Sequence, residues 1–253
     1  DCKLYNSTFT LNKVGDDGGA IYWKGEEGYI YNITCRINNA IGRGNSTSKG
    51  GDVALIGSNA VLTKSKFEMN SAIVDGGSIY ATGNYINITE SAFIKSNVTF
   101  GGNVSKNNFG GGSIYVLGNN SNIINCSFDM VHATKGGAIY IQGHNVTIDN
   151  ATSLRSYANE GGAIFVEGQN ATILKSNITY SNTTNSSGGA VYIQGANANV
   201  SESYFAYCIG GRDSSSSIRY VDGGAIYVNG NNAVIEKSEF LRNNVSQACG
   251  AIY

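Results

Sequence analysis

The chain has 253 residues, a formal net charge of −1 and only 14% charged residues. This composition excludes the basic surface typical of nucleic-acid-binding proteins, and the sequence contains no signal peptide and no apolar run long enough to insert into a membrane. The 34 glycines and the absence of proline favour short strands and tight turns, because proline cannot donate to a strand ladder. Both ends fall inside a repeat unit, so we expect a segment of a longer chain.

A unit that opens with two glycines recurs along the whole sequence. The first glycines of the units are Gly18, Gly50, Gly76, Gly111, Gly136, Gly161, Gly188 and Gly223. A last unit begins at Cys249-Gly250-Ala251-Ile252-Tyr253. The basic period is about 26 residues, with three longer units, which is typical of a solenoid with one turn per repeat.

Each unit contains three short segments with the alternation of a half-buried strand. In the first, aliphatic residues occupy positions four and six, as in Ile139 and Ile141. Position eight is always glycine, where we expect a positive φ and the end of the strand. Position thirteen, such as Ile148, and position eighteen, usually phenylalanine, mark the second and third strands. Position ten is asparagine in six units, where we expect a hydrogen-bonded ladder: Asn59, Asn120, Asn145, Asn170, Asn197 and Asn232.

This pattern predicts an all-β fold: a right-handed, single-stranded parallel β-helix of about nine coils, forming one domain over residues 1–253. Identical residues would then stack one rung apart, about 4.8 Å. The handedness rests on the general preference of β-crossovers. A β-sandwich is the alternative, but it would not require glycine at one fixed position in every unit.

Three inserts lengthen the repeat, at residues 40–49, 97–110 and 209–222. All three lie between the third strand and the next glycine pair, so we expect them along one corner of the solenoid. They are either binding loops or tolerated surface insertions.

Position five of the first strand is almost always aromatic. If positions four and six point inward, these rings point outward and form an exposed stripe, which we expect to be a binding or assembly surface. The alternative is that the rings only stabilise neighbouring strands. The residues are Tyr22, Tyr80, Tyr115, Tyr140, Phe165, Tyr192, Tyr227 and Tyr253.

Sixteen Asn-X-Ser/Thr triplets favour an exported, N-glycosylated protein, although copying of an Asn-rich repeat would also generate them. We expect accessible acceptors at an outward turn, Asn6, Asn32, Asn125 and Asn150, and in the inserts, Asn45, Asn97 and Asn103. Asn145 and Asn170 also begin such triplets, but they belong to the expected ladder. Their amides should therefore be engaged and unmodified.

No constellation of catalytic or metal-binding residues stands out. The five cysteines do not form a plausible disulfide framework, and two histidines support neither a metal site nor a catalytic triad. Lys24, Asp52 and Glu167 are expected at outward positions of different coils, without charged companions. Acidic residues before the glycine pairs are interpreted as solubilising turn residues: Asp17, Asp75, Glu160 and Asp222. We therefore expect no cofactor and no enzymatic activity, with a polysaccharide lyase or hydrolase as an alternative.

Two short motifs carry a family resemblance. Phe-X-X-Asn at Phe9–Asn12, Phe67–Asn70 and Phe240–Asn243, together with Gly-Gly-Ala-(Ile/Val), resembles the repeats of chlamydial polymorphic membrane proteins. Asn6-Ser7-Thr8-Phe9-Thr10 before Gly-Gly-Ala-Ile-Tyr is similar to adhesin-like surface proteins of methanogenic archaea.

Both resemblances imply an extracellular, cell-surface β-helix that carries adhesion determinants. Its partners would be surface glycans or proteins of another cell. The alternative is a structural subunit of a filament or sheath, in which copies of the chain stack end to end.

Overall fold

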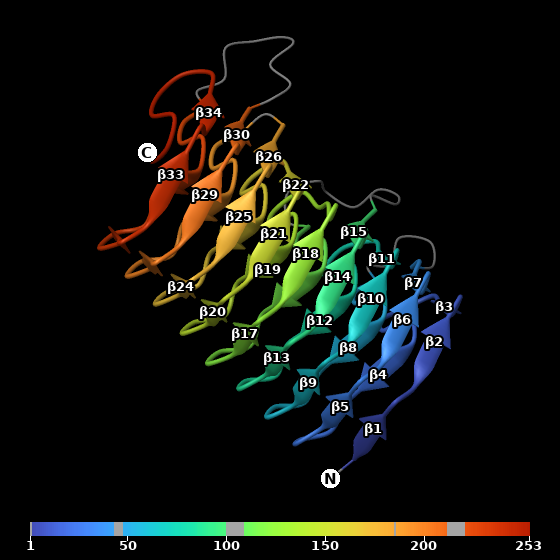
Figure 1. The fold of residues 1–253 in the computed structure, drawn as a ribbon. Helices are drawn as coiled ribbons and strands as arrows, with labels where there is room; N and C mark the ends of the chain where they lie inside the picture. Colours follow the sequence, from blue (N-terminus) through green and yellow to red (C-terminus); the bar gives the residue numbers. More distant parts are fainter. Residues whose placement is uncertain (1, 43–47, 100–108, 185, 212–220) are drawn as a thin grey trace.

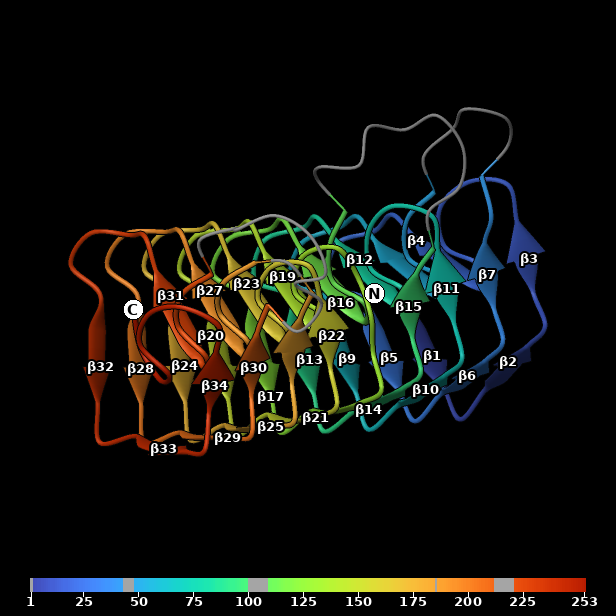
Figure 2. The ribbon, with the colours of Figure 1, turned by 90° about the horizontal axis from the view of Figure 1, so that it is seen from above.

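A computed structural model describes residues 2–42, 48–99, 109–184, 186–211 and 221–253. All 34 named elements in these ranges are short strands, and every strand pairing is parallel. Successive coils stack in chain order from the N-terminal to the C-terminal end (Figures 1 and 2). The predicted parallel β-helix is confirmed. Nothing helical in the described ranges is long and apolar enough to span a bilayer.

Two nine-stranded sheets contain the second and third strands of the repeat, in agreement with the expected nine coils. Sheet A consists of β1 (Lys3–Tyr5), β5 (Tyr29–Tyr31), β9 (Val61–Thr63), β13 (Asn87–Thr89), β17 (Asn122–Ile124), β20 (Thr147–Asp149), β24 (Thr172–Leu174), β28 (Asn199–Ser201) and β32 (Val234–Glu236). Sheet B consists of β2 (Thr8–Thr10), β6 (Thr34–Arg36), β10 (Lys66–Glu68), β14 (Ala92–Ile94), β18 (Ser127–Asp129), β21 (Thr152–Leu154), β25 (Asn177–Thr179), β29 (Tyr204–Ala206) and β33 (Glu239–Leu241).

The remaining strands form the other sides of the solenoid. Sheet D contains the first strand of the repeat: β4 (Ile21–Trp23), β8 (Val53–Leu55), β12 (Ile79–Ala81), β16 (Ile114–Val116), β19 (Ile139–Ile141), β23 (Ile164–Val166), β27 (Val191–Ile193) and β31 (Ile226–Val228). A fourth strand per coil was not predicted, because two residues are too few to show alternation. These strands form sheet C in two parts: β3 (Lys13–Val14), β7 (Asn39–Ala40), β11 (Ser71–Ala72) and β15 (Asn97–Val98), then β22 (Tyr157–Ala158), β26 (Asn182–Thr183), β30 (Ile209–Gly210) and β34 (Asn244–Val245).

Stacked side chains fill the interior of the solenoid. The phenylalanine column forms parallel stacks, with ring centroids 4.8 Å apart between Phe67 and Phe93 and 5.2 Å apart between Phe205 and Phe240. Isoleucines such as Ile148 are fully buried beside them. The interior stack is therefore as predicted, because identical residues fall in register on successive coils.

The glycine positions have two different causes. The first glycine of each pair adopts a positive φ, 57° at Gly136, which a residue with a side chain tolerates poorly. The second cannot carry a Cβ, because a Cβ on Gly137 would collide with the carbonyl oxygen of Gly162 on the next coil. The expectation of positive φ at position eight is wrong. There, a Cβ on Gly143 would collide with the Gly118 carbonyl, and the positive φ lies instead at Asn145.

The predicted asparagine ladder is present on the outside of the corner between sheets D and A. Each side-chain amide donates to the Oδ1 of the preceding coil, over 3.0 Å from Asn145 to Asn120 and 2.9 Å from Asn170 to Asn145. Asn197 and Asn232 continue the ladder at 3.1 and 3.2 Å. These amides are exposed and bond to one another, so they do not satisfy buried backbone groups.

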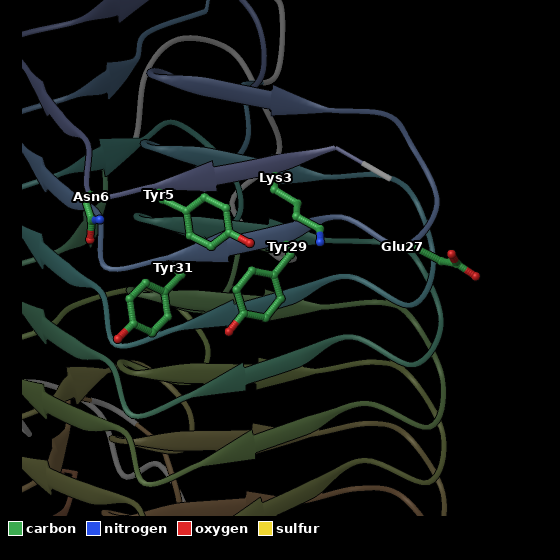
Figure 3. Close-up of a pocket in the computed structure, with 6 residues that line it drawn as sticks. All are labelled: Lys3, Tyr5, Asn6, Glu27, Tyr29 and Tyr31. Carbon is green, nitrogen blue, oxygen red and sulfur yellow. The ribbon is translucent and has the colours of Figure 1, made fainter.

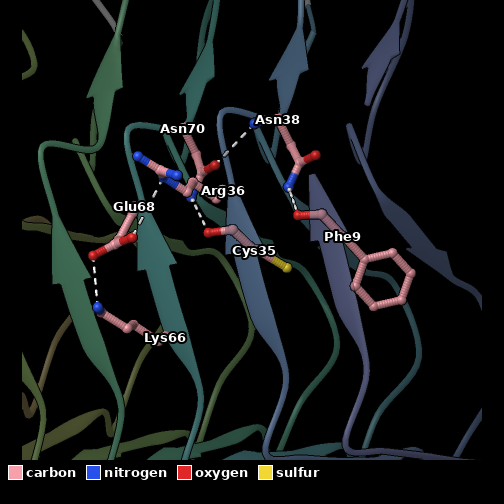
Figure 4. A network of polar contacts seen from close by, with 7 residues as sticks. All are labelled: Phe9, Cys35, Arg36, Asn38, Lys66, Glu68 and Asn70. Atoms are coloured by element: carbon pink, nitrogen blue, oxygen red, sulfur yellow. Dashed lines mark hydrogen bonds and ion pairs between the residues drawn. The ribbon is translucent and has the colours of Figure 1, made fainter. Parts of the chain in front are cut away.

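The asparagine of the Phe-X-X-Asn motif forms a second ladder, inside the solenoid (Figure 4). Asn70 donates to the carbonyl of Cys35 over 3.3 Å and accepts from the backbone N–H of Asn38 over 3.0 Å. Asn243 repeats both bonds, to Phe205 and from Cys208, at 2.9 Å each. At Asn70 and Asn243 the motif therefore ties its coil to the one before it through hydrogen bonds that are buried or partly buried.

The cysteines are unpaired, as predicted. Cys35, Cys126 and Cys208 are buried, whereas Cys2 and Cys249 are exposed. Burial raises the pKa of the Cys126 and Cys208 thiols to about 12. These thiols therefore stay protonated and act as small apolar residues.

Candidate functional site

The aromatic residues at position five stack along sheet D, as predicted. Ring centroids are 5.4 Å apart between Tyr80 and Tyr115, 4.9 Å between Tyr115 and Tyr140, and 5.3 Å between Tyr140 and Phe165. Tyr192, Tyr227 and Tyr253 continue the series. The rings form an apolar cluster separate from the interior core, so they point away from the solenoid axis.

The expectation that these rings form an exposed stripe is wrong for Tyr80, Tyr115, Tyr140 and Phe165, which are all buried. Tyr140 is only 2% exposed, whereas Tyr22, in the same column, is 56% exposed. Tyr192 and Tyr227 are half-buried, and Tyr253 is exposed.

The cover over these rings comes from the residue that precedes each glycine pair. A Cβ on Gly110 would collide with the ring of Tyr140, so this backbone lies directly on it. The Nζ of Lys49 lies 4.5 Å from the ring centroid of Tyr80, and that of Lys135 lies 4.6 Å from the centroid of Phe165.

These covering residues also form ion pairs, so the interpretation of the acidic residues as simple solubilising groups is wrong for Asp75 and Glu160. The expectation that Glu167 has no charged companion is wrong as well. Lys49 contacts Asp75 over 3.4 Å, and Lys135 contacts Glu160 and Glu167 over 3.8 and 3.3 Å. Burial raises the pKa of Asp75 to about 6, against the opposing effect of Lys49. These lysines and their acidic partners therefore stabilise the covered rings through ion pairs and cation–π contacts.

Asp52 is also placed differently from the sequence expectation. It lies inside the solenoid, fully buried, at a position where other coils have alanine or serine. The side-chain amide of Asn38 donates to its Oδ1 over 2.8 Å. Burial nevertheless raises the pKa of this carboxyl well above its usual range, because the hydrogen bonds offset only part of the desolvation.

Surface tyrosines gather at two places that the sequence did not single out; Tyr5 and Tyr180 are exposed there, whereas Tyr29, Tyr31 and Tyr207 are half-buried. The first is on the outer face of sheet A, around a cavity of about 540 Å³ (Figure 3). Tyr5 from β1 and Tyr29 and Tyr31 from β5 line it, with ring centroids 5.8 to 6.3 Å apart. Lys3, Asn6 and Glu27 complete the lining.

The second place is a cavity of about 510 Å³ at the corner between sheets B and C, here called the corner groove. The rings of Tyr180 and Tyr207 are stacked there at 4.9 Å with an interplanar angle of 4°. The signal in the sequence was a pair of tyrosines one coil apart, but the groove appears only when the neighbouring column is placed beside them. The lining residues are Arg155, Ser156, Tyr157, Tyr180, Asn182, Tyr207 and Ile209.

The candidate glycosylation residues fall into three groups. Asn6, Asn32, Asn125 and Asn150 are exposed at a corner, as expected, but the expected contrast with the engaged amides of Asn145 and Asn170 is wrong for Asn32 and Asn150. Asn32 donates to Asn6 over 2.7 Å and Asn150 to Asn125 over 2.9 Å, so they also form ladders. Asn97 is half-buried in β15 and not in an open loop. Asn45 and Asn103, like most of the three inserts, lie outside the described residues.

The described residues hold no group of three or more histidine, cysteine or acidic side chains arranged as a metal site. Burial raises the pKa of Tyr115 and of Tyr140 far above the usual value, so both phenols are neutral. Among the described residues, the two tyrosine clusters that line cavities are therefore the candidates for contact with a ligand.

Comparison with known proteins adds one short match. A family model for the Chlamydia polymorphic membrane protein repeat matches residues 6–22. This stretch contains Phe9 and Asn12 of the Phe-X-X-Asn motif, followed by Gly18-Gly19-Ala20-Ile21. No curated protein and no solved structure matches the chain. The resemblance to archaeal adhesin-like proteins has no counterpart in these comparisons.

Proposed function

We propose that this chain is the rod of an extracellular, cell-surface protein that attaches its cell to glycans or proteins of a partner cell. The observation that carries the proposal is the match of residues 6–22 to a polymorphic membrane protein repeat. Both motif elements in that stretch have structural counterparts along the rod: the internal asparagine recurs at Asn70 and Asn243, and the glycine pair occurs eight times.

The geometry of the rod is consistent with attachment. Its coils are fixed by continuous parallel ladders, so side chains on its surface are held in a rigid array. Exposed and half-buried tyrosines gather around two cavities on this array, and such apolar patches often mark binding surfaces. We infer that the role is non-catalytic, because the carboxylates beside the rings of sheet D, Asp75, Glu160 and Glu167, are engaged in ion pairs with lysines.

Labelling and competition experiments test this proposal. Antibodies raised against the chain should label intact producing cells, and protease treatment of those cells should remove the label. Soluble chain added in excess should reduce attachment of the cells to their target, because it occupies the same partner sites. The denatured chain is the matched control. Label found only after permeabilisation, or attachment unaffected by the soluble chain, would contradict the proposal.

A further inference from the structure

We propose that the corner groove binds a neutral glycan, with sugar rings packed against Tyr180 and Tyr207. This inference rests on the proposed function in surface attachment and names the chemical class of the partner. The groove is chosen because it lies on the sixth to eighth coils, with a further coil beyond it, and combines accessible rings, polar groups and a paired charge.

The groove is built from two parallel columns of side chains. Arg155, Tyr180 and Tyr207 occupy the corner after sheet B and have positive φ values of 55°, 53° and 55°, which direct them away from the rod. Tyr157, Asn182 and Ile209 begin the sheet C strands β22, β26 and β30 and form the opposite wall. Two rung spacings make the groove about 10 Å long, enough for about two sugar rings.

The backbone holds both walls in place. The N–H of Asn182 donates to the carbonyl of Ser156, and that of Ile209 to the carbonyl of Ser181, each over 3.0 Å. The side-chain amide of Asn182 donates to the carbonyl of Tyr180 over 3.3 Å, which links the walls. A preformed groove loses little conformational entropy when a ligand binds.

The lining has the chemistry that a sugar requires. The Tyr180 side chain is exposed, with 49% of its residue surface accessible. The negative face of an aromatic ring attracts the weakly positive C–H groups of a pyranose ring. The two phenol hydroxyls provide donors and acceptors for sugar hydroxyls.

The charges around the groove favour a neutral ligand. Arg155 makes a bidentate contact with Asp129, at 2.7 and 2.8 Å, so its charge is already balanced. His132 packs against Tyr157 at 5.1 Å, and burial lowers its pKa, so it is neutral at pH 7. Arg242 lies 6.0 Å from the ring centroid of Tyr207 and has no ion pair with any described residue. It is a flanking cation outside the groove lining.

Calorimetric titration with defined oligosaccharides tests this proposal. The probes are cellohexaose, chitohexaose and mannohexaose, with hexagalacturonate as the acidic comparison. At least one neutral hexasaccharide should bind, and Tyr180→Ala and Tyr207→Ala should each weaken it by about tenfold or more, because each removes a stacking ring. Tyr180→Phe keeps the ring and should change the affinity by less than about threefold.

Tyr85→Ala is the matched control. Tyr85 is also an exposed corner tyrosine, with a φ of 57° and 54% exposure, but it does not line either tyrosine cavity. The Tyr85→Ala variant should bind the neutral hexasaccharide with the affinity of the unaltered chain. The melting temperatures of all variants establish that they are folded. If Tyr207→Ala is less stable, the comparison of Tyr180→Ala with Tyr180→Phe decides the outcome.

Three results would overturn the proposal: no binding of any neutral hexasaccharide, binding of hexagalacturonate alone, or equal losses in Tyr85→Ala and Tyr180→Ala. The attachment function is judged separately by the competition experiment. A chain that competes for attachment without binding neutral glycans would refute the groove and leave the proposed function in place. Glycan binding through Tyr180 without competition would refute the attachment role alone.

Discussion

Replacing Tyr140 by serine should destabilise the rod severely, whereas the same change at Tyr22 should not. Tyr140 is 2% exposed and lies between the rings of Tyr115 and Phe165, in edge-to-face contacts at 85° and 88°. A buried aromatic side chain covers roughly 150–250 Å². At about 25 cal/mol per Å², its removal costs roughly 4–6 kcal/mol at most, and measured losses for buried rings are about 3–5 kcal/mol.

Tyr22 belongs to the same column but is 56% exposed, and its neighbour on the next coil is Ala54. Tyr22→Ser should therefore lower the free energy of unfolding by less than about 1 kcal/mol. Urea denaturation followed by far-ultraviolet circular dichroism measures both variants. If Tyr140→Ser lost no more stability than Tyr22→Ser, the rings of sheet D would not be buried, and they would again be candidates for the binding surface.

Three further changes test other features of the structure. Asp52→Asn should increase the free energy of unfolding. The pKa of Asp52 is higher in the folded chain than in the unfolded chain. The free energy of unfolding of the wild type therefore falls as the pH rises through the range between these two pKa values, by about 1.4 kcal/mol per pH unit. The gain should therefore be larger at pH 7 than at pH 4 in urea titrations, and a pH-independent gain would contradict the assignment. Asn170→Ala should cost about 1–2 kcal/mol, because Asn170 has a φ of 57°, whereas Asn170→Gly, which tolerates that φ, should cost less in thermal melts. Equal losses would show that the ladder amides matter more than the backbone. In glycopeptide mapping of protein from its native source, we expect higher occupancy at Asn125 than at Asn150, because Asn150 donates its amide to Asn125. The reverse order would mean that this ladder does not govern modification.

The predictable features were those in which the same type of residue stacks on successive coils. Phe67 and Phe93, or Asn145 and Asn170, are recognisable because the same side chain returns at the same phase, and stacking then follows from the rung spacing. The burial of Tyr140 could not be read this way. Its cover comes from the backbone at Gly110, which is distant in sequence and approaches the ring only through the turn geometry. Lys135 covers Phe165 of the next coil in the same way.

The corner groove escaped prediction for a related reason. Tyr180 and Tyr207 are one coil apart and could be paired from the repeat alone. Their opposite wall depends on strands of two residues, such as β26, whose position no periodicity reveals. The prediction for Asp52 was wrong because strict alternation along the strand would point this residue outward. In the structure, the chain enters sheet D from the turn with Asp52 facing inward.

The close contact at Gly137 also bears on how such a protein can change in evolution. Each second glycine rests against the carbonyl of the next coil, so every coil has the same cross-section at that point and joins any other in the same way. Whole repeats can therefore be duplicated or deleted in the gene without redesigning a junction. Each added copy would lengthen the rod by about 4.8 Å. The length of the rod can thus be set by copy number, independently of the surface features that individual coils present.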